Sequence, residues 1–219
     1  MESANYFLCS FSPLCSKPMG LEATRQFGHP PFIDGSCRRE PDLENDAPAI
    51  SALCRKRKFA PRLHPGDGVV YIGKKRRYPE TLGKRWPLVA VLTVIERFES
   101  HKDAAKWYRS KRFNLPKNCM VAGNKPLDLA DTSGPKDWHC LDESKPHEVI
   151  KRWNAEYQAR ADDCGIFLAC RVNCLCLHTP KMLDDAMMTE IMGRIPGTQN
   201  PPEIDREQFD RFLARAKKA

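Results

Sequence analysis

Residues 64–96 read HPGDGVVYIGKKRRYPETLGKRWPLVAVLTVIE and carry the clearest structural pattern of the chain. Its first five residues have the composition of a turn, because Pro and Gly preset the backbone angles that turns need. Val69–Ile72 and Leu88–Ile95 are short apolar runs rich in β-branched residues, which favour buried strands. Cationic residues flank the predicted hairpin tip between them. The stretch therefore predicts two paired strands that follow a Gly-Asp turn.

The rest of the chain adds strands, helices and one long irregular segment. Asn5–Phe11 and Gly165–Leu177 have the content of strands. Helices are predicted after an N-cap at Ser100 or Asp103, over 50–57, 147–161 and 180–192, and over 205–218, where Phe209, Phe212 and Leu213 share a face. Residues 12–48 are crowded with Pro, Gly and turn formers, which predicts a functional or disordered loop.

Few short strands separated by irregular loops indicate a particular fold class. We expect an α+β protein, a small mixed β-barrel with decorating helices. The expected organisation is a single domain over residues 1–219, with 178–219 as a C-terminal helical extension.

Composition and charge limit the partners. The 219 residues are 41% hydrophobic and 29% charged, as in ordinary globular proteins. No apolar run approaches the ~18 residues of a membrane span, and Met1–Ser10 lacks the pattern of a secretory signal. We therefore expect a cytoplasmic protein with no membrane partner. The net charge of +8 favours polyanions such as nucleic acid, DNA or RNA.

Ten cysteines raise the question of metal or disulfides. None of them form a CxxC pair, and a reducing cytosol disfavours disulfides. Cys174, Cys176 and His178 could share one face of a strand, but three ligands so close together would crowd a tetrahedral ion. Glycine-rich loops for nucleotide cofactors are also missing from the sequence. We predict no metal and no cofactor.

The middle of the chain resembles a known superfamily. Gly66-Asp67 is followed by a strand at Val69–Tyr71, a second strand at Val89–Glu96 and a helical segment at Asp103–Tyr108. This order is similar to the central part of PUA-like domains, which include the ASCH, EVE, YTH and SRA-type modules. The chain also resembles, more loosely, the bacterial and phage nucleotide modification associated domains.

The resemblance implies a function and a place for it. PUA-like modules of the EVE kind bind a flipped or free base in a pocket walled by the loop that precedes the Gly-Asp turn. Here the pocket would lie under residues 28–45, and residues 32–40 match that loop. The implied protein is a nucleic-acid-binding module that recognises a modified or flipped base. A modification or restriction enzyme is an implied partner.

The side chains of this loop suit base recognition. Asp34 can accept hydrogen bonds from an exocyclic amine, and Ser36 can satisfy a carbonyl oxygen. Arg38 and Arg39 can pair with phosphate, and Gly35 allows close approach of the backbone. The alternative is a surface loop in which Asp34 caps a turn and the arginines pair with neighbouring acids.

Other basic and aromatic residues extend the predicted interface. Trp86, which follows Lys84 and Arg85, can stack on a base, although a tryptophan is more often a core anchor. The residues expected to contact the nucleic-acid backbone are Lys74, Lys75, Arg76, Arg77, Lys106, Arg109 and Arg112. Their alternative role is a solvated hairpin tip and helix face.

An enzymatic function stays open beside the binding one. Some ASCH relatives are hydrolases, and base-modifying chemistry belongs to the same alternative. Cys37 beside arginines would be the nucleophile, because neighbouring cations lower the pKa of a thiol. His29 or His64 would act as base, and Asp34 or Glu40 as acid. A third class, a protein-interaction adaptor, would use the C-terminal amphipathic helix.

Overall fold

A computed structural model describes residues 4–55, 58–79, 81–135, 144–197 and 200–218. The strands are β1 (Tyr6–Phe11), β2 (Ala49–Ser51), β3 (Gly68–Gly73), β4 (Arg76–Arg77), β5 (Lys84–Phe98), β6 (Phe167–Leu175), β7 (Lys181–Leu183) and β8 (Glu203–Ile204). The helices are α1 (Pro18–Phe27), α2 (His101–Ser110), α3 (Pro146–Asp163), α4 (Asp185–Met192) and α5 (Arg206–Lys217).

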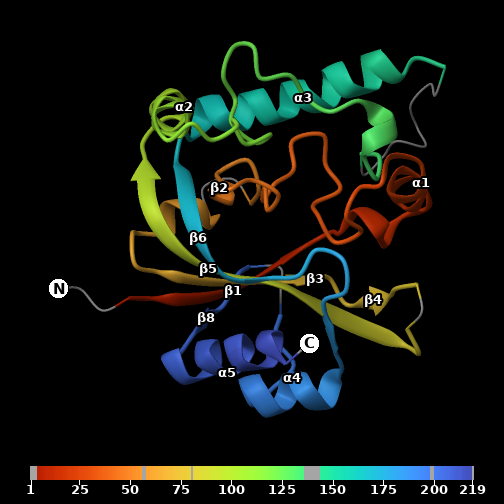
Figure 1. The fold of residues 1–219 in the computed structure, drawn as a ribbon, viewed down its shortest axis with the longest axis vertical. Coiled ribbons are helices and arrows are strands. Elements are labelled where there is room, and N and C mark those ends of the chain that lie inside the picture. The colour runs from red at the N-terminus through yellow and green to blue at the C-terminus, as the bar shows by residue number, and fades with distance from the viewer. Residues whose placement is uncertain (1–3, 56–57, 80, 136–143, 198–199, 219) are drawn as a thin grey trace.

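The strands form one mixed sheet that crosses the middle of the molecule (Figure 1). Its order is β2-β6-β5-β3-β1-β8, while β4 and β7 pair with β5. β1 and β3 are parallel, and the other neighbours in this order are antiparallel. Among the described residues the sheet is not closed, so the expected α+β class is confirmed but a barrel is not shown.

The Gly-Asp turn ties three segments of the sheet together. Gly66 adopts a positive φ of 99°, which glycine tolerates without strain. The buried carboxylate of Asp67 accepts hydrogen bonds from the backbone N–H groups of Asn5 and His64, both at 2.8 Å. Its backbone carbonyl accepts a hydrogen bond from the N–H of Val94. The turn thereby fixes the start of β1, the start of β3 and the outer half of β5.

Alternation along the strands gives the sheet two buried faces. In β1 and β3, Phe7 and Val69 face one core and Leu8 and Val70 face the other. The second core is completed by α4 and α5, which supply the buried side chains Met188, Ile191, Phe209 and Phe212. Figure 1 shows these two helices on one side of the sheet and α1, α2 and α3 on the opposite side.

Most of the predicted elements are confirmed. The two strands after the turn are β3 and β5, which pair antiparallel as a hairpin. The strands expected near residues 5–11 and 165–177 are β1 and β6, and the helices expected near 147–161 and 205–218 are α3 and α5. The N-cap of α2 is Ser100, whose side chain accepts a hydrogen bond from the N–H of Asp103.

The short helix predicted over residues 50–57 is wrong for residues 50–55, and residues 56–57 lie outside the part of the chain that the structure describes. Ala49–Ser51 is β2, which pairs antiparallel with the Phe167–Ala169 part of β6. The local sequence has no strong helical pattern, so pairing with a distant strand decides its conformation. The helix predicted over 180–192 is shorter than expected, because β7 takes its first residues and Asp184 caps α4.

The long loop predicted over residues 12–48 contains a helix, α1. Pro18 occupies its first turn, and Gly28 ends it in the left-handed conformation with a φ of 69°. Both are ordinary boundary signals of a helix. The density of other turn formers around them concealed the helix.

One more observation concerns membranes. Within the residues that the structure describes, no helix is both long enough and apolar enough to cross a bilayer.

Replacing Asp67 with alanine should destabilise the fold. The change leaves two backbone N–H groups without their acceptor, so we expect the free energy of unfolding to fall by about 1–3 kcal/mol. Urea denaturation measures the change. His64→Ala is the matched control, because the His64 side chain is exposed and the substitution keeps the backbone N–H. Equal stability of the two variants would contradict the role assigned to the carboxylate.

Candidate binding pocket

The loop predicted to wall a pocket, residues 28–45, is folded around the carboxyl group of Asp34. Oδ1 of Asp34 accepts hydrogen bonds from the backbone N–H groups of Ser36 and Glu40, at 2.9 and 3.1 Å. Both bonds go to the same oxygen, so Oδ2 receives neither of them. Gly35 packs so tightly against Ser133 that a Cβ would lie 2.4 Å from its Oγ. The close approach that glycine permits here is therefore to the protein itself.

Arg38 and Arg39 hold this loop in place from inside. Arg38 donates to the Asn154 side chain at 2.7 Å and to the backbone carbonyl of Asn124 at 2.8 Å. Arg39 donates to the carbonyls of Asp34 and Asp131, at 2.8 and 2.9 Å. Both side chains are buried. They position the loop rather than present their guanidinium groups to a phosphate.

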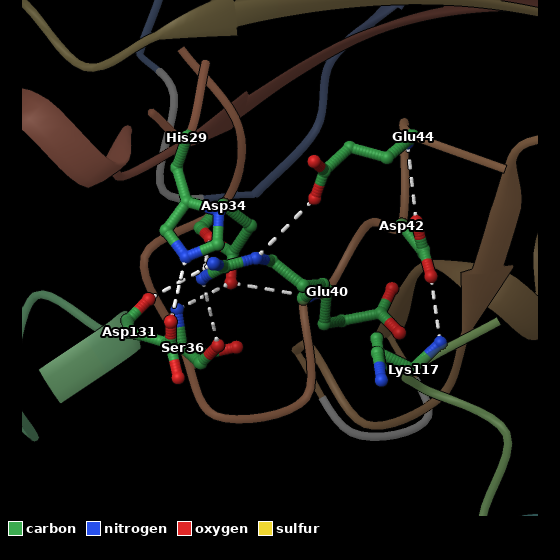
Figure 2. Close-up of polar contacts among 9 residues, drawn as sticks. His29, Asp34, Ser36, Glu40, Asp42, Glu44, Lys117 and Asp131 are labelled. Carbon is green, nitrogen blue, oxygen red and sulfur yellow. Dashed lines mark hydrogen bonds and ion pairs between the residues drawn. The ribbon is translucent and has the colours of Figure 1, made fainter. Parts of the chain in front are cut away.

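Glu40 and Asp42 attach the far end of the loop to its neighbours. The carboxylate of Glu40 accepts hydrogen bonds from the backbone N–H and hydroxyl of Ser51 and from the Asn118 amide. Asp42 accepts a hydrogen bond from the backbone N–H of Lys117 at 2.6 Å (Figure 2). Figure 2 also shows His29 reaching Asp131, at 2.7 Å, on the other side of the loop. The loop is thus a rigid wall, held at both ends.

A cavity of about 1080 Å³ opens beside this wall. It lies between the loop, the ends of β1 and β3, and the inner face of α3. The described residues that line it include Ser10, Phe11, Ser12, Lys17, Asp34, Gly35, Ser36, Glu40, Leu53, Cys54, Arg55, Lys74, Arg76, Ser133, Gly134, Pro135, Val149, Arg152, Trp153, Glu156, Tyr157 and Arg160. The hollow expected beneath the 28–45 loop is present.

Two aromatic residues of α3 form one side of the cavity. Trp153 and Tyr157 lie one helical turn apart, with ring centroids 6.3 Å apart and planes inclined by 32°. Tyr157 is buried, whereas Trp153 is half-buried and keeps part of its indole open to the cavity. A flat ligand can therefore stack on Trp153 while its edge faces the loop.

Cations from several segments surround the opening. Arg76 donates to the carbonyl of Ser16 at 2.7 Å, and Arg55 to the carbonyl of Ser10 at 2.7 Å. Arg160 donates to the carbonyl of Leu53 at 3.0 Å and lies over the Tyr157 ring. A carbonyl fixes a guanidinium group but does not neutralise its charge. These contacts orient the three cations, and Arg160 also pairs with Glu156 at 3.5 Å, so the lining carries charges of both signs.

Two carboxyl groups and one hydroxyl group that line the cavity are buried. Burial raises the pKa of the Asp34 carboxyl, against the opposing effects of its hydrogen bonds and of Arg39. Burial also raises the pKa of Glu40 to about 8. The Ser36 hydroxyl is buried beside Asp34 and Tyr157, yet makes no well-formed hydrogen bond within the described residues. Asp34 and Ser36 thus offer hydrogen-bonding capacity to a ligand.

The remaining predicted contact residues are divided between the cavity and other surfaces. Lys74 and Arg76 line the cavity. Trp86 is buried in the core beside α4, with Lys75 over its ring. Arg77 is an exposed residue of β4 that is not among the lining residues. The cations of the helical segment, Lys106, Arg109 and Arg112, are exposed on or just after α2, away from the lining.

Cys37 lies in a chemical environment opposite to the one expected. It is fully buried in a small core with Leu53 and Met120 and does not line the cavity. Burial raises the pKa of its thiol to about 12, although Arg38 opposes this. The expected activation by neighbouring arginines is thus outweighed by desolvation. His29 and His64 also lie outside the set of lining residues.

The side of the cavity formed by α3 was missed from the sequence. Val149, Trp153 and Tyr157 recur at the helical spacing that predicts α3. Arg152, Glu156 and Arg160 interleave with these residues and also line the cavity. Cations interleaved with aromatics on a helix could have indicated a binding face.

Searches for other kinds of site and for relatives add little. In the described part of the chain, no group of three or more His, Cys, Asp or Glu side chains is placed to hold a metal ion. No protein-family model, curated protein or solved structure matches the chain.

Stability should fall as the pH rises from about 6.5 through 8. The ordinary pKa of a glutamate is 4.5, so between 4.5 and about 8 the folded protein holds a proton on Glu40 that the unfolded chain releases. The contribution of Glu40 to the free energy of unfolding is therefore full below pH 4.5 and is lost as the pH passes 8. The free energy of unfolding falls by up to about 1.4 kcal/mol per pH unit in this window. His101, whose pKa burial lowers to about 4, acts in the opposite direction but below pH 6.5.

Glu40→Gln should flatten this dependence, because glutamine carries no titrating proton. Chemical denaturation at a series of pH values measures it. Glu156→Gln is the control, since Glu156 is an exposed residue of the α3 wall, and it should keep the wild-type slope. A wild-type protein with no slope in this window would overturn the assignment.

Proposed function

We propose that this protein binds nucleic acid or its components by accepting a nucleobase in the cavity beside the 28–45 loop. One observation carries the proposal: the buried carboxyl of Asp34, whose Oδ1 is held by two backbone N–H groups, lines a cavity together with Trp153 and several cations. A base taken out of its stack is held by hydrogen bonds to its edge together with stacking on an aromatic face. Asp34 and Ser36 supply the edge contacts, and Trp153 supplies the stacking face.

The charge of the molecule supports a nucleic-acid partner. The chain carries a net charge of +8, and Lys74 and Arg76, predicted to contact the nucleic-acid backbone, lie at the cavity. Cations at the mouth of a pocket attract the phosphates on either side of a flipped nucleotide. Trp86, in contrast, is removed from the proposed base site because it belongs to the core.

The PUA-like relationship is part of this proposal. Its support is the order of the Gly66-Asp67 turn, the antiparallel strands β3 and β5, and α2 directly after them. A cavity beside the loop that precedes the turn agrees with the place of the ligand in EVE-like modules. A closed barrel, the choice between DNA and RNA, a modified base and a partner modification or restriction enzyme are predictions that follow from the same resemblance.

The enzymatic alternative has less support. Its nucleophile would be Cys37, a buried thiol with a raised pKa outside the cavity lining. A binding protein should return its ligand unchanged, whereas a hydrolase or base-modifying enzyme should consume it. Chromatography of the ligand after incubation with the protein separates the two.

Asp34→Asn should weaken binding of the preferred nucleoside by roughly tenfold or more, which corresponds to about 1.4 kcal/mol. Asparagine can keep the acceptor oxygen for the backbone N–H groups of Ser36 and Glu40, but it replaces Oδ2 with an NH₂ donor. The polarity of the hydrogen bond offered to the base is thereby reversed. Isothermal titration with the common ribonucleosides, deoxynucleosides and their base-methylated counterparts measures the effect.

Trp153→Ala should also weaken binding, by roughly tenfold, because a stacked base loses about 1–3 kcal/mol when its aromatic partner is removed. Arg112→Ala is the control, since Arg112 is exposed beyond the end of α2, and it should bind like the wild type. Thermal melting confirms that each variant is folded. No Asp34-dependent binding of any base-bearing compound, free or in an oligonucleotide, would overturn the proposed function.

A further inference from the structure

Three cations that line the cavity come from segments that contact one another. They are Lys17, which caps α1, Lys74, which follows β3, and Arg76 of β4, and we call them the basic rim. Contacts link the segments that carry them. Arg76 donates to the carbonyl of Ser16, next to Lys17, and the N–H of Lys74 donates to the carbonyl of Phe11. The fold therefore brings like charges from three segments to one place.

Arg76 has an unused pair of donors. One terminal nitrogen donates to the Ser16 carbonyl at 2.7 Å. Its Nε is buried and has no hydrogen-bond partner within the described residues. Nε and the second terminal nitrogen form one edge of the guanidinium plane, and this edge fits two oxygens of a phosphate or carboxylate. A buried donor without a partner beside a cavity indicates an acceptor that a ligand supplies.

The partners of Lys17 agree with an anion site. Its ammonium group donates to the carbonyls of Gly134 and Pro135, at 3.1 and 3.2 Å. These two carbonyls orient the ammonium group, and like charges brought close together repel one another. An anion bound between Lys17, Lys74 and Arg76 would relieve that repulsion.

The cavity is also larger than a nucleobase alone would fill. Pockets for drug-sized ligands have volumes of about 300–1,000 Å³, and this cavity reaches about 1080 Å³. A base stacked on Trp153, with its edge at Asp34, leaves room for a sugar and a phosphate. The basic rim lines the same cavity as Asp34 and Trp153, so it is available to the phosphate of such a ligand.

We infer that the cavity binds a whole nucleotide, with the base at Asp34 and Trp153 and its own phosphate on the basic rim. This inference rests on the proposed function and adds the chemical class of the ligand, a phosphate monoester or diester of a nucleoside. The phosphate can come from a free mononucleotide or from a nucleotide within a strand. Both sources present the same oxygens to Arg76.

The test compares four probes with the same base, chosen as the preferred one. They are the nucleoside, its 5′-monophosphate, a single-stranded trinucleotide with that base in the middle, and inorganic phosphate. We expect the monophosphate or the trinucleotide to bind at least roughly tenfold more tightly than the nucleoside, as a bidentate arginine contact contributes about that much. Tighter binding of the monophosphate than of the trinucleotide identifies a free nucleotide, and the reverse identifies a strand.

Arg76→Met tests the residue that carries the inference. It should remove the advantage of the phosphate-bearing probes and leave the affinity for the nucleoside within about twofold of the wild type. Arg77→Met is the matched control, because Arg77 is the next residue of β4 but is exposed and not a lining residue. The Arg77→Met variant should still bind the phosphate-bearing probes more tightly than the nucleoside. Thermal melts of both variants show whether each is folded.

The outcomes separate this inference from the function on which it rests. A nucleoside that binds through Asp34, with no gain from the phosphate, overturns the inference and leaves the proposed function standing. An equal loss of nucleoside and monophosphate affinity in Arg76→Met also overturns it. Binding of inorganic phosphate alone, with no contribution from any base, overturns the proposed function and the inference together.

Discussion

The buried loop at residues 34–42 sets the main constraint on this molecule, because almost all of its polar groups must find partners away from bulk water. Asp34 satisfies two backbone N–H groups within the loop, and Arg39 satisfies the carbonyl of Asp34 in the loop and that of Asp131 outside it. Glu40 then holds β2 through Ser51. An unsatisfied buried polar group costs about 1–3 kcal/mol, so the loop has few other conformations of similar energy. The cavity has a defined shape because this wall is rigid.

Cations within this rigid wall and cations outside it have different partners. Arg38 and Arg39, which lie within the loop, donate their hydrogen bonds to oxygens of the protein and stabilise its fold. Arg76 reaches the cavity from outside the loop and, within the described residues, is held by the Ser16 carbonyl alone. Arg160 is held by the carbonyl of Leu53 and also pairs with Glu156. The remaining donors of Arg76 are therefore the ones that a ligand can use. Position relative to the loop therefore decides which cations are structural and which are available.

The sequence predicted those features that depend on local patterns. The β-branched runs of β3 and β5, the Ser100 cap and the amphipathic faces of α3 and α5 are read directly from short stretches, and the loop was correctly placed beside a hollow. Features set by distant partners were not predictable in this way. Residues 49–51 form a strand only because β6 lies beside them, and Trp153 faces the cavity only because α3 packs over the loop. Likewise, nothing local to Arg38 reveals that Asn124 and Asn154 receive its hydrogen bonds.

Anchoring by neutral groups also explains how one cavity can keep charges of both signs. A mobile arginine facing a mobile carboxylate would form an ion pair and close the space between them. Here the carboxyl of Asp34 is fixed by two N–H groups of its own loop, and Arg76 is fixed by the carbonyl of Ser16. Each anchor restricts motion without neutralising charge, so the two groups stay apart. The separation is built into the backbone, and a ligand with a hydrogen-bonding edge at one end and an anion at the other complements it.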